Sequence, residues 1–135
     1  MSDAANEAVS KGDGYAVAQL DALGEGPGFR KIRKELGVTA FGVNAIVLPP
    51  SYATGSHYHD EQEELYFVHS GRVEFEFGDG STQQLGPGGL AWVDAPTERK
   101  VRNLSDSEDE VYVVIGGKGG YVGRDGKLSE GESHR

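Results

Sequence analysis

Two histidines and a glutamate stand close together near the middle of the sequence. His57 and His59 flank a single tyrosine, and Glu64 follows at the start of the next predicted strand. Residues two apart on a strand point to the same side, so both imidazole rings can face one point. Two imidazoles and one carboxylate leave coordination positions open on a divalent metal ion. The pattern therefore predicts a metal site formed by His57, His59 and Glu64.

Other side chains carry weaker signals for chemistry. Tyr66 shares the strand face of Glu64, so it is a candidate acid or hydrogen-bond donor in the same pocket, or a packed ring. His69 has the opposite parity and is expected at the surface or at an interface. Trp92 is expected in the core or at an interface. The chain has no cysteine and no Gly-x-Ser-x-Gly motif, which disfavours nucleophilic hydrolases.

A series of short β-strands is predicted to position these side chains. The segment 72–77 places its apolar residues on one face and its charged residues on the other. Asp79-Gly80 then predicts a type I′ hairpin. Strands are predicted over residues 39–48, 64–70, 72–77, 82–85, 90–93, 98–104 and 110–115. Short strands between turns rich in glycine and proline are typical of an all-β sandwich or barrel.

Both ends of the chain are expected to lie outside this barrel. Residues 1–14 are small and polar and predict a flexible N-terminal arm. Residues 15–116 are expected to form one domain, which starts with a short strand over 15–23 and a helix or a strand over 29–36. Residues 117–135 combine glycines with charges and predict a flexible C-terminal tail.

The composition narrows the classes of partner. The 135 residues fit a single domain, and 22 acidic against 13 basic side chains give a net charge of −9. Such a charge repels phosphate backbones and disfavours nucleic acid as a partner. No apolar run is long enough to span a membrane, and no basic segment precedes an apolar one at the N-terminus. We expect a cytoplasmic protein, with which the absence of cysteine is compatible.

The same residues resemble the two sequence motifs of the cupin family. The first motif is matched by five residues: Gly55, His57, His59, Glu64 and Gly71. Its leading glycine lies closer to the first histidine than in the family. The second motif is similar to Pro87-Gly88-Gly89 and the segment 94–103, which ends on Asn103. The resemblance implies a double-stranded β-helix, or jelly-roll barrel, that holds its ligand in the mouth of the barrel.

One position departs from the family pattern. Where the second cupin motif has a histidine, this chain has Arg99, which is a permanent cation and a poor metal ligand. Its parity with Val101 and Asn103 indicates that Arg99 points inward. Two alternatives follow. Arg99 anchors an anionic substrate beside a three-ligand metal site, or it pairs with Glu64 in a metal-free pocket.

The resemblance alone does not choose an activity, because cupins host many. It implies a protein that binds a small anionic molecule beside a divalent metal ion (Fe, Mn, Ni or Zn). As an enzyme it would be a dioxygenase or isomerase with Tyr66 and Arg99 in catalytic roles. The alternatives are a metal-free ligand-binding or sensing module and a domain that serves only in assembly. Small cupins also imply a homodimer, in which an N-terminal strand is shared between protomers.

Overall fold

Strand β6 (Glu63–Ser70) shows why this sequence forms a layered β-structure. In the computed structural model, which describes residues 8–130, Glu64, Tyr66 and Val68 are buried. They alternate with Leu65 and Phe67, whose side chains are exposed on the opposite face. The period of two lets one face of the strand pack inward while the other faces outward.

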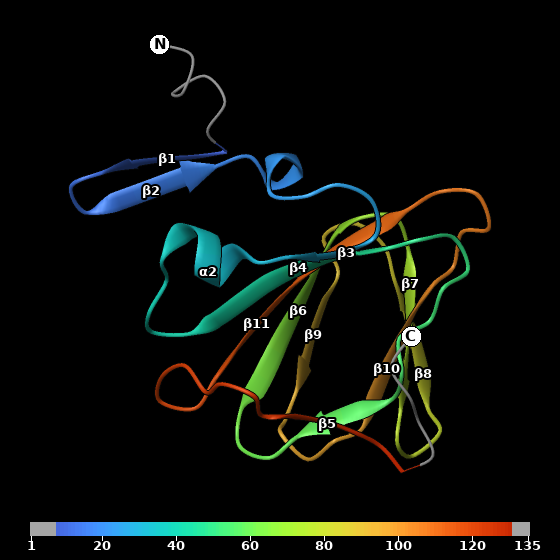
Figure 1. The fold of residues 1–135 in the computed structure, drawn as a ribbon. Helices are drawn as coiled ribbons and strands as arrows, with labels where there is room; N and C mark the ends of the chain where they lie inside the picture. The colour runs from blue at the N-terminus through green and yellow to red at the C-terminus, as the bar shows by residue number, and fades with distance from the viewer. Residues whose placement is uncertain (1–7, 131–135) are drawn as a thin grey trace.

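Two five-stranded antiparallel sheets build the barrel (Figure 1). One sheet has the order β3 (Gly28–Arg30), β4 (Gly42–Leu48), β11 (Glu110–Gly117), β6 and β9 (Leu90–Val93). The other has the order β12 (Gly126–Leu128), β5 (His57–His59), β10 (Arg99–Asn103), β7 (Val73–Phe77) and β8 (Thr82–Leu85). The core cluster between them comprises Leu48, Tyr66, Val68, Val73, Phe75, Val93, Val101 and Tyr112. The all-β, double-stranded β-helix predicted from the sequence is confirmed.

The hairpin between β7 and β8 differs from the predicted turn type. A type I′ turn needs positive φ at both central residues, and here Gly80 has a φ of 88° while Asp79 does not have a positive φ. The amide of Gly80 donates to the carbonyl of Phe77, and the amide of Phe77 donates to that of Ser81. The connection is therefore a three-residue loop with glycine in the left-handed position. The hairpin was predicted correctly, but its turn type was wrong.

The segment before the barrel is more ordered than the predicted arm. Strands β1 (Val9–Gly12) and β2 (Tyr15–Ala18) pair in a hairpin that forms a sheet of its own and extends away from the barrel (Figure 1). A short 3₁₀ helix, η1 (Leu20–Ala22), takes the rest of the strand predicted over 15–23. Residues 1–7 of the predicted arm lie outside the described part of the chain.

The segment 29–36, for which a helix and a strand were both open, contains parts of both. It begins in β3 and continues in the helix α2 (Ile32–Leu36), which ends at Gly37 with a φ of 81°. The positive φ lets the chain reverse into β4 with little steric cost because glycine has no Cβ atom.

The predicted flexible tail needs the larger correction. Strand β11 includes Gly117, and β12 pairs with β5, so this segment belongs to the barrel. Asp125 and Ser129 are buried within it. Residues 131–135 of the predicted tail lie outside the described residues. Between residues 8 and 130, no helix is both long enough and apolar enough to cross a membrane.

Candidate metal centre

Strands β5 and β6 bring the predicted ligands together. His57 and His59 lie at the two ends of β5, and Glu64 is the second residue of β6. One potential ligand atom from each of the three side chains lies within 4.8 Å of those of the other two. His59 and Glu64 are buried and His57 is half-buried. The structure thus assembles the predicted donor set at one place inside the barrel.

Glu64 is held as a carboxylate by its neighbours. Its Oε1 accepts a hydrogen bond of 2.7 Å from the hydroxyl of Tyr66, and its Oε2 lies 3.2 Å from Nε2 of His59. Burial acts to raise the pKa of Glu64, but the contacts with His59 and Tyr66 and the charge of Arg99 together hold this pKa below its usual value. The carboxylate is therefore available to a cation at neutral pH.

Arg99 lies inside the barrel, as its parity indicates. It is fully buried, it pairs with His57 across β10 and β5, and its Nη2 lies 3.8 Å from Oε1 of Glu64. Its guanidinium also donates to the main-chain carbonyls of Asp94, at 3.2 Å, and Ala95, at 3.5 Å. The cation is thus anchored between Glu64 and the main chain.

His57 lies where a neutral imidazole is favoured. Burial and the nearby charge of Arg99 lower the pKa of His57 below its usual value. A neutral imidazole is the form that binds metal ions. The rings of His57 and His59 meet edge to face, with their centroids 5.5 Å apart.

The residues fit a metal ion held by three ligands. Nε2 of His59 is buried, and it has no hydrogen-bond partner among the described residues, although it lies 3.2 Å from Oε2 of Glu64. Once free of a proton, this nitrogen would be satisfied by a bound cation. Arg99 takes the place of a fourth protein ligand, so His57, His59 and Glu64 would leave the remaining positions of the metal open.

A cavity of about 900 Å³ adjoins this cluster. His57, His59, Glu64 and Tyr66 line it, together with residues of β4 and β11 and the C-terminal segment 121–128. Arg99 is fully buried and does not line the cavity. Direct contact between Arg99 and a ligand, as predicted from the sequence, therefore finds no support in this geometry. The cations that do line the cavity are Arg124 and Lys127.

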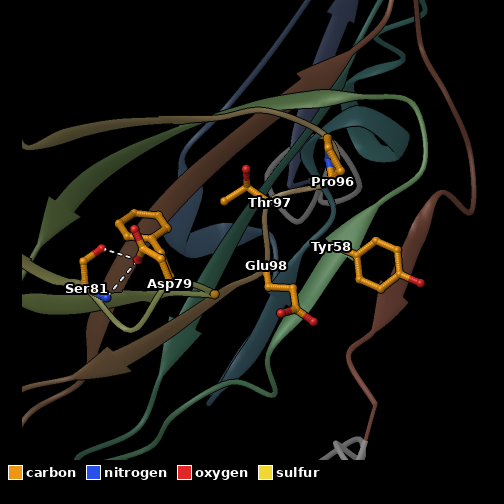
Figure 2. A pocket seen from close by; sticks show the side chains of 8 residues that line it. Tyr58, Asp79, Ser81, Pro96, Thr97 and Glu98 are labelled. Carbon is orange, nitrogen blue, oxygen red and sulfur yellow. Dashed lines mark hydrogen bonds between the residues drawn. The ribbon is translucent and has the colours of Figure 1, made fainter.

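A second hollow, of about 690 Å³, is lined by residues that include Tyr58, Asp79, Pro96 and Glu98 (Figure 2). Tyr58 lines it because its side chain points away from those of His57 and His59. Asp79 and Glu98 contribute carboxylates, and Asp79 accepts hydrogen bonds from the amide and hydroxyl of Ser81. None of the five predicted site residues lies here.

Two residues at the site were not predicted. Gln62 is buried, and its amide nitrogen lies 3.1 Å from Nδ1 of His59 and 3.3 Å from Oε2 of Glu64. The parity that links Tyr66 to Glu64 also applies to Gln62, so the sequence held a signal for it. Asp125, whose Oδ2 lies 3.7 Å from Nδ1 of His59, belongs to a segment without any alternating pattern.

Comparisons with known proteins agree with the architecture. The family model described as "Cupin domain" matches residues 45–116, which is more than half of the chain. No curated protein sequence matches the chain. Among solved structures, a sugar phosphate isomerase of the cupin superfamily from Silicibacter pomeroyi DSS-3 is 25% identical, with a TM-score of 0.56 over 87% of this chain and 67% of that one.

Two further solved structures are similar. A chain in a structure of the DMSP lyases RdDddP and RnDddQII is 28% identical, with a TM-score of 0.57 over 67% of this chain and 44% of that one. This chain therefore spans less than half the length of that lyase chain. A conserved double-stranded β-helix protein from Klebsiella pneumoniae is 22% identical, with a TM-score of 0.59 over 67% of this chain and 76% of that one.

Proposed function

Because the chain belongs to the cupin family, we propose that it binds a divalent metal ion through His57, His59 and Glu64 and a small anionic molecule in the adjoining cavity. The observation that carries the proposal is the convergence of three ligand atoms within 4.8 Å on the wall of a cavity of about 900 Å³. When bound, the metal would supply a Lewis acid with open coordination positions.

The chain's own residues would prepare this site in two ways. Arg99 and Tyr66 both contact Oε1 of Glu64, which leaves Oε2 facing His59. Burial raises the pKa of Tyr66 well above its usual value, so the phenol stays protonated and can act as a hydrogen-bond donor. The site thus combines a fixed carboxylate with a neutral donor beside it.

An anionic ligand is favoured by the basic residues around the cavity. Arg124 and Lys127 line the cavity, and both lie outside residues 45–116, which the family model matches. Among the similar solved structures, one is a sugar phosphate isomerase, whose substrate class is anionic, and another holds DMSP lyases. These likenesses favour an isomerase or a lyase. The dioxygenase predicted from the sequence remains a prediction.

Metal analysis of the full chain, purified without chelators, tests the metal site. We expect close to one bound metal ion per chain, and its loss in His57→Ala, His59→Ala and Glu64→Gln. His69→Ala is the matched control, because His69 is an exposed histidine on the opposite face of β6. Metal-free wild-type protein whose melting temperature is unchanged by added metal or chelator would overturn the proposal.

A specific observation also favours the metal-free alternative. The 3.8 Å contact between Arg99 and Glu64 already gives the carboxylate a cationic partner. In that case the protein is a ligand-binding or sensing module, and anionic ligands raise its melting temperature without any metal. A thermal-shift screen of sugar phosphates and carboxylates, with and without chelator, separates the two functions.

A further inference from the structure

The C-terminal segment supplies the strand that lies beside the two histidines. In the pairing of β12 with β5, Gly126 lies opposite His59 and Leu128 lies opposite His57. The amide of Ser129 extends the pairing by donating to the carbonyl of Ser56 at 2.9 Å. Figure 1 shows this segment crossing below β11 to reach β5. It lies outside the residues matched by the cupin family model, so the histidine strand is supported from beyond the family domain.

Asp125 is the most strongly held residue of this segment. It is 6% exposed, and its Oδ2 accepts hydrogen bonds from the amides of Glu61, at 2.9 Å, and Gln62, at 2.8 Å. Its own carbonyl accepts from the amide of Asp60, at 3.3 Å. These bonds fix the loop between β5 and β6, and they place Oδ2 only 3.7 Å from Nδ1 of His59.

The neighbouring backbone leaves the His59 ring little freedom. A Cβ atom on Gly126 would lie 3.2 Å from Cε1 of His59, so the ring packs directly against the backbone of β12. A side chain at position 126 would require the ring to shift by a few tenths of an ångström. The ring is therefore held with Nε2 toward Glu64 and Nδ1 toward Gln62 and Asp125.

These contacts favour one position for the proton on a neutral His59 ring. The amide nitrogen of Gln62 can only donate, so its 3.1 Å contact makes Nδ1 an acceptor and leaves the proton on Nε2, facing Glu64. A metal ion on Nε2 needs the opposite tautomer, in which Nδ1 carries the proton and requires an acceptor. Asp125 has the carboxylate closest to that position.

Resting on the metal site proposed above, we propose that Asp125 is a positioning residue that accepts the Nδ1 proton of His59 when Nε2 binds the metal ion. In this exchange Nε2 releases its proton to solvent, Nδ1 takes up a proton from solvent, and Gln62 gives up its bond to Nδ1. The C-terminal segment is then part of the metal site. Without Asp125, the contact with Gln62 would hold His59 in the tautomer that cannot bind a metal ion through Nε2.

Zinc titration of the full chain by calorimetry tests this role. We expect Asp125→Asn, which keeps the shape but removes the acceptor charge, to weaken zinc binding about 10- to 100-fold. Glu61→Gln is the matched control, because it removes a charge from an exposed side chain in the loop that Asp125 holds. Equal zinc affinity in Asp125→Asn and Glu61→Gln would overturn the proposal.

A second measurement needs no variant and separates positioning from folding. Nitrogen-15 spectra of the imidazoles should show the proton of His59 on Nε2 in metal-free protein and on Nδ1 in the zinc-loaded protein. A zinc-loaded protein that keeps the proton on Nε2 would refute the role of Asp125 while leaving the metal site intact. If wild-type protein binds neither zinc nor any other divalent metal ion, the proposed metal site fails as well, so the two failures are distinguishable.

Discussion

At the scale of single residues, Glu110 is the least satisfied group in the core. It is fully buried at the start of β11, and neither carboxylate oxygen has a hydrogen-bond partner among the described residues. Burial raises the pKa of Glu110 from 4.5 to about 8, so the folded protein holds it protonated at neutral pH. The unfolded chain releases the same proton near pH 4.5.

Because Glu110 holds its proton more tightly in the folded protein than in the unfolded chain, it stabilises the folded protein at low pH and less so as the pH rises. The stabilisation that comes from the proton of Glu110 is fully present below pH 4.5 and is lost as the pH rises to about 8. It amounts to at most roughly 1.4 kcal/mol for each unit by which the two pKa values differ. We expect Glu110→Gln to flatten this fall, so that the variant gains stability relative to wild type between pH 5 and pH 9. Urea unfolding at both pH values measures it, with the exposed Glu108→Gln as control. Parallel pH profiles for wild type and Glu110→Gln would contradict this.

Arg99 gives a second prediction at the residue scale. Its guanidinium competes with a metal ion for Glu64, from which it lies 3.8 Å away. Arg99→His removes this competition and offers a fourth ligand, so we expect at least about tenfold tighter zinc binding by calorimetry. Arg102→His is the control on the same strand, because Arg102 pairs with Glu74 and not with Glu64. It should leave the zinc affinity unchanged. Weaker binding in Arg99→His would show that the arginine supports the site.

At the scale of elements, the sequence predicted strands well and the tail poorly. Alternation along 64–70 and 72–77 is a local property, and β6 and β7 formed close to these bounds. The ligand set could be predicted for the same reason. Alternation along a strand places His57 and His59 on the same side of one strand and Glu64 on the same side of the next strand as Tyr66. β12 has no such signal: its three residues form a strand only because β5 offers unpaired backbone groups.

The role of β12 leads to an element-scale prediction. Truncation after Arg124 removes both Asp125 and the pairing of β12 with β5. We expect this truncation to lower the free energy of unfolding by roughly 1–3 kcal/mol and to abolish zinc binding. Truncation after Glu130 keeps β12 and is expected to change neither quantity. Equal stability of the two truncated chains in denaturant titrations would show that β12 contributes nothing to the barrel.

At the scale of the whole molecule, the outer face of β6 and β9 is unusually apolar. Leu65 lies opposite Trp92 and Phe67 lies opposite Leu90, and these side chains are 39–63% exposed. Such a patch, on the order of 400 Å², is about half of the ~800 Å² that each partner buries in a standard interface. The projecting β1–β2 hairpin, which is itself marginal as an isolated pair of strands, exposes further apolar side chains.

The homodimer expected from the sequence would cover both surfaces at once. If the hairpin of each copy packs on the β6–β9 face of the other, the two-fold arrangement closes and the buried area approaches the required size. We expect sedimentation to show a dimer for wild type and a monomer for the double change Leu90→Lys with Trp92→Glu. Leu104→Glu, at an exposed position directly after β10 of the other sheet, is the control. A monomeric wild-type protein at micromolar concentration would contradict this arrangement.

The most direct test of the metal site is anomalous X-ray diffraction from crystals grown with zinc. The expected result is one anomalous peak per chain, at about 2.0–2.2 Å from nitrogens of His57 and His59 and an oxygen of Glu64. The contrary result is a crystal with zinc present but no peak at these side chains, and with the guanidinium of Arg99 still paired to Glu64.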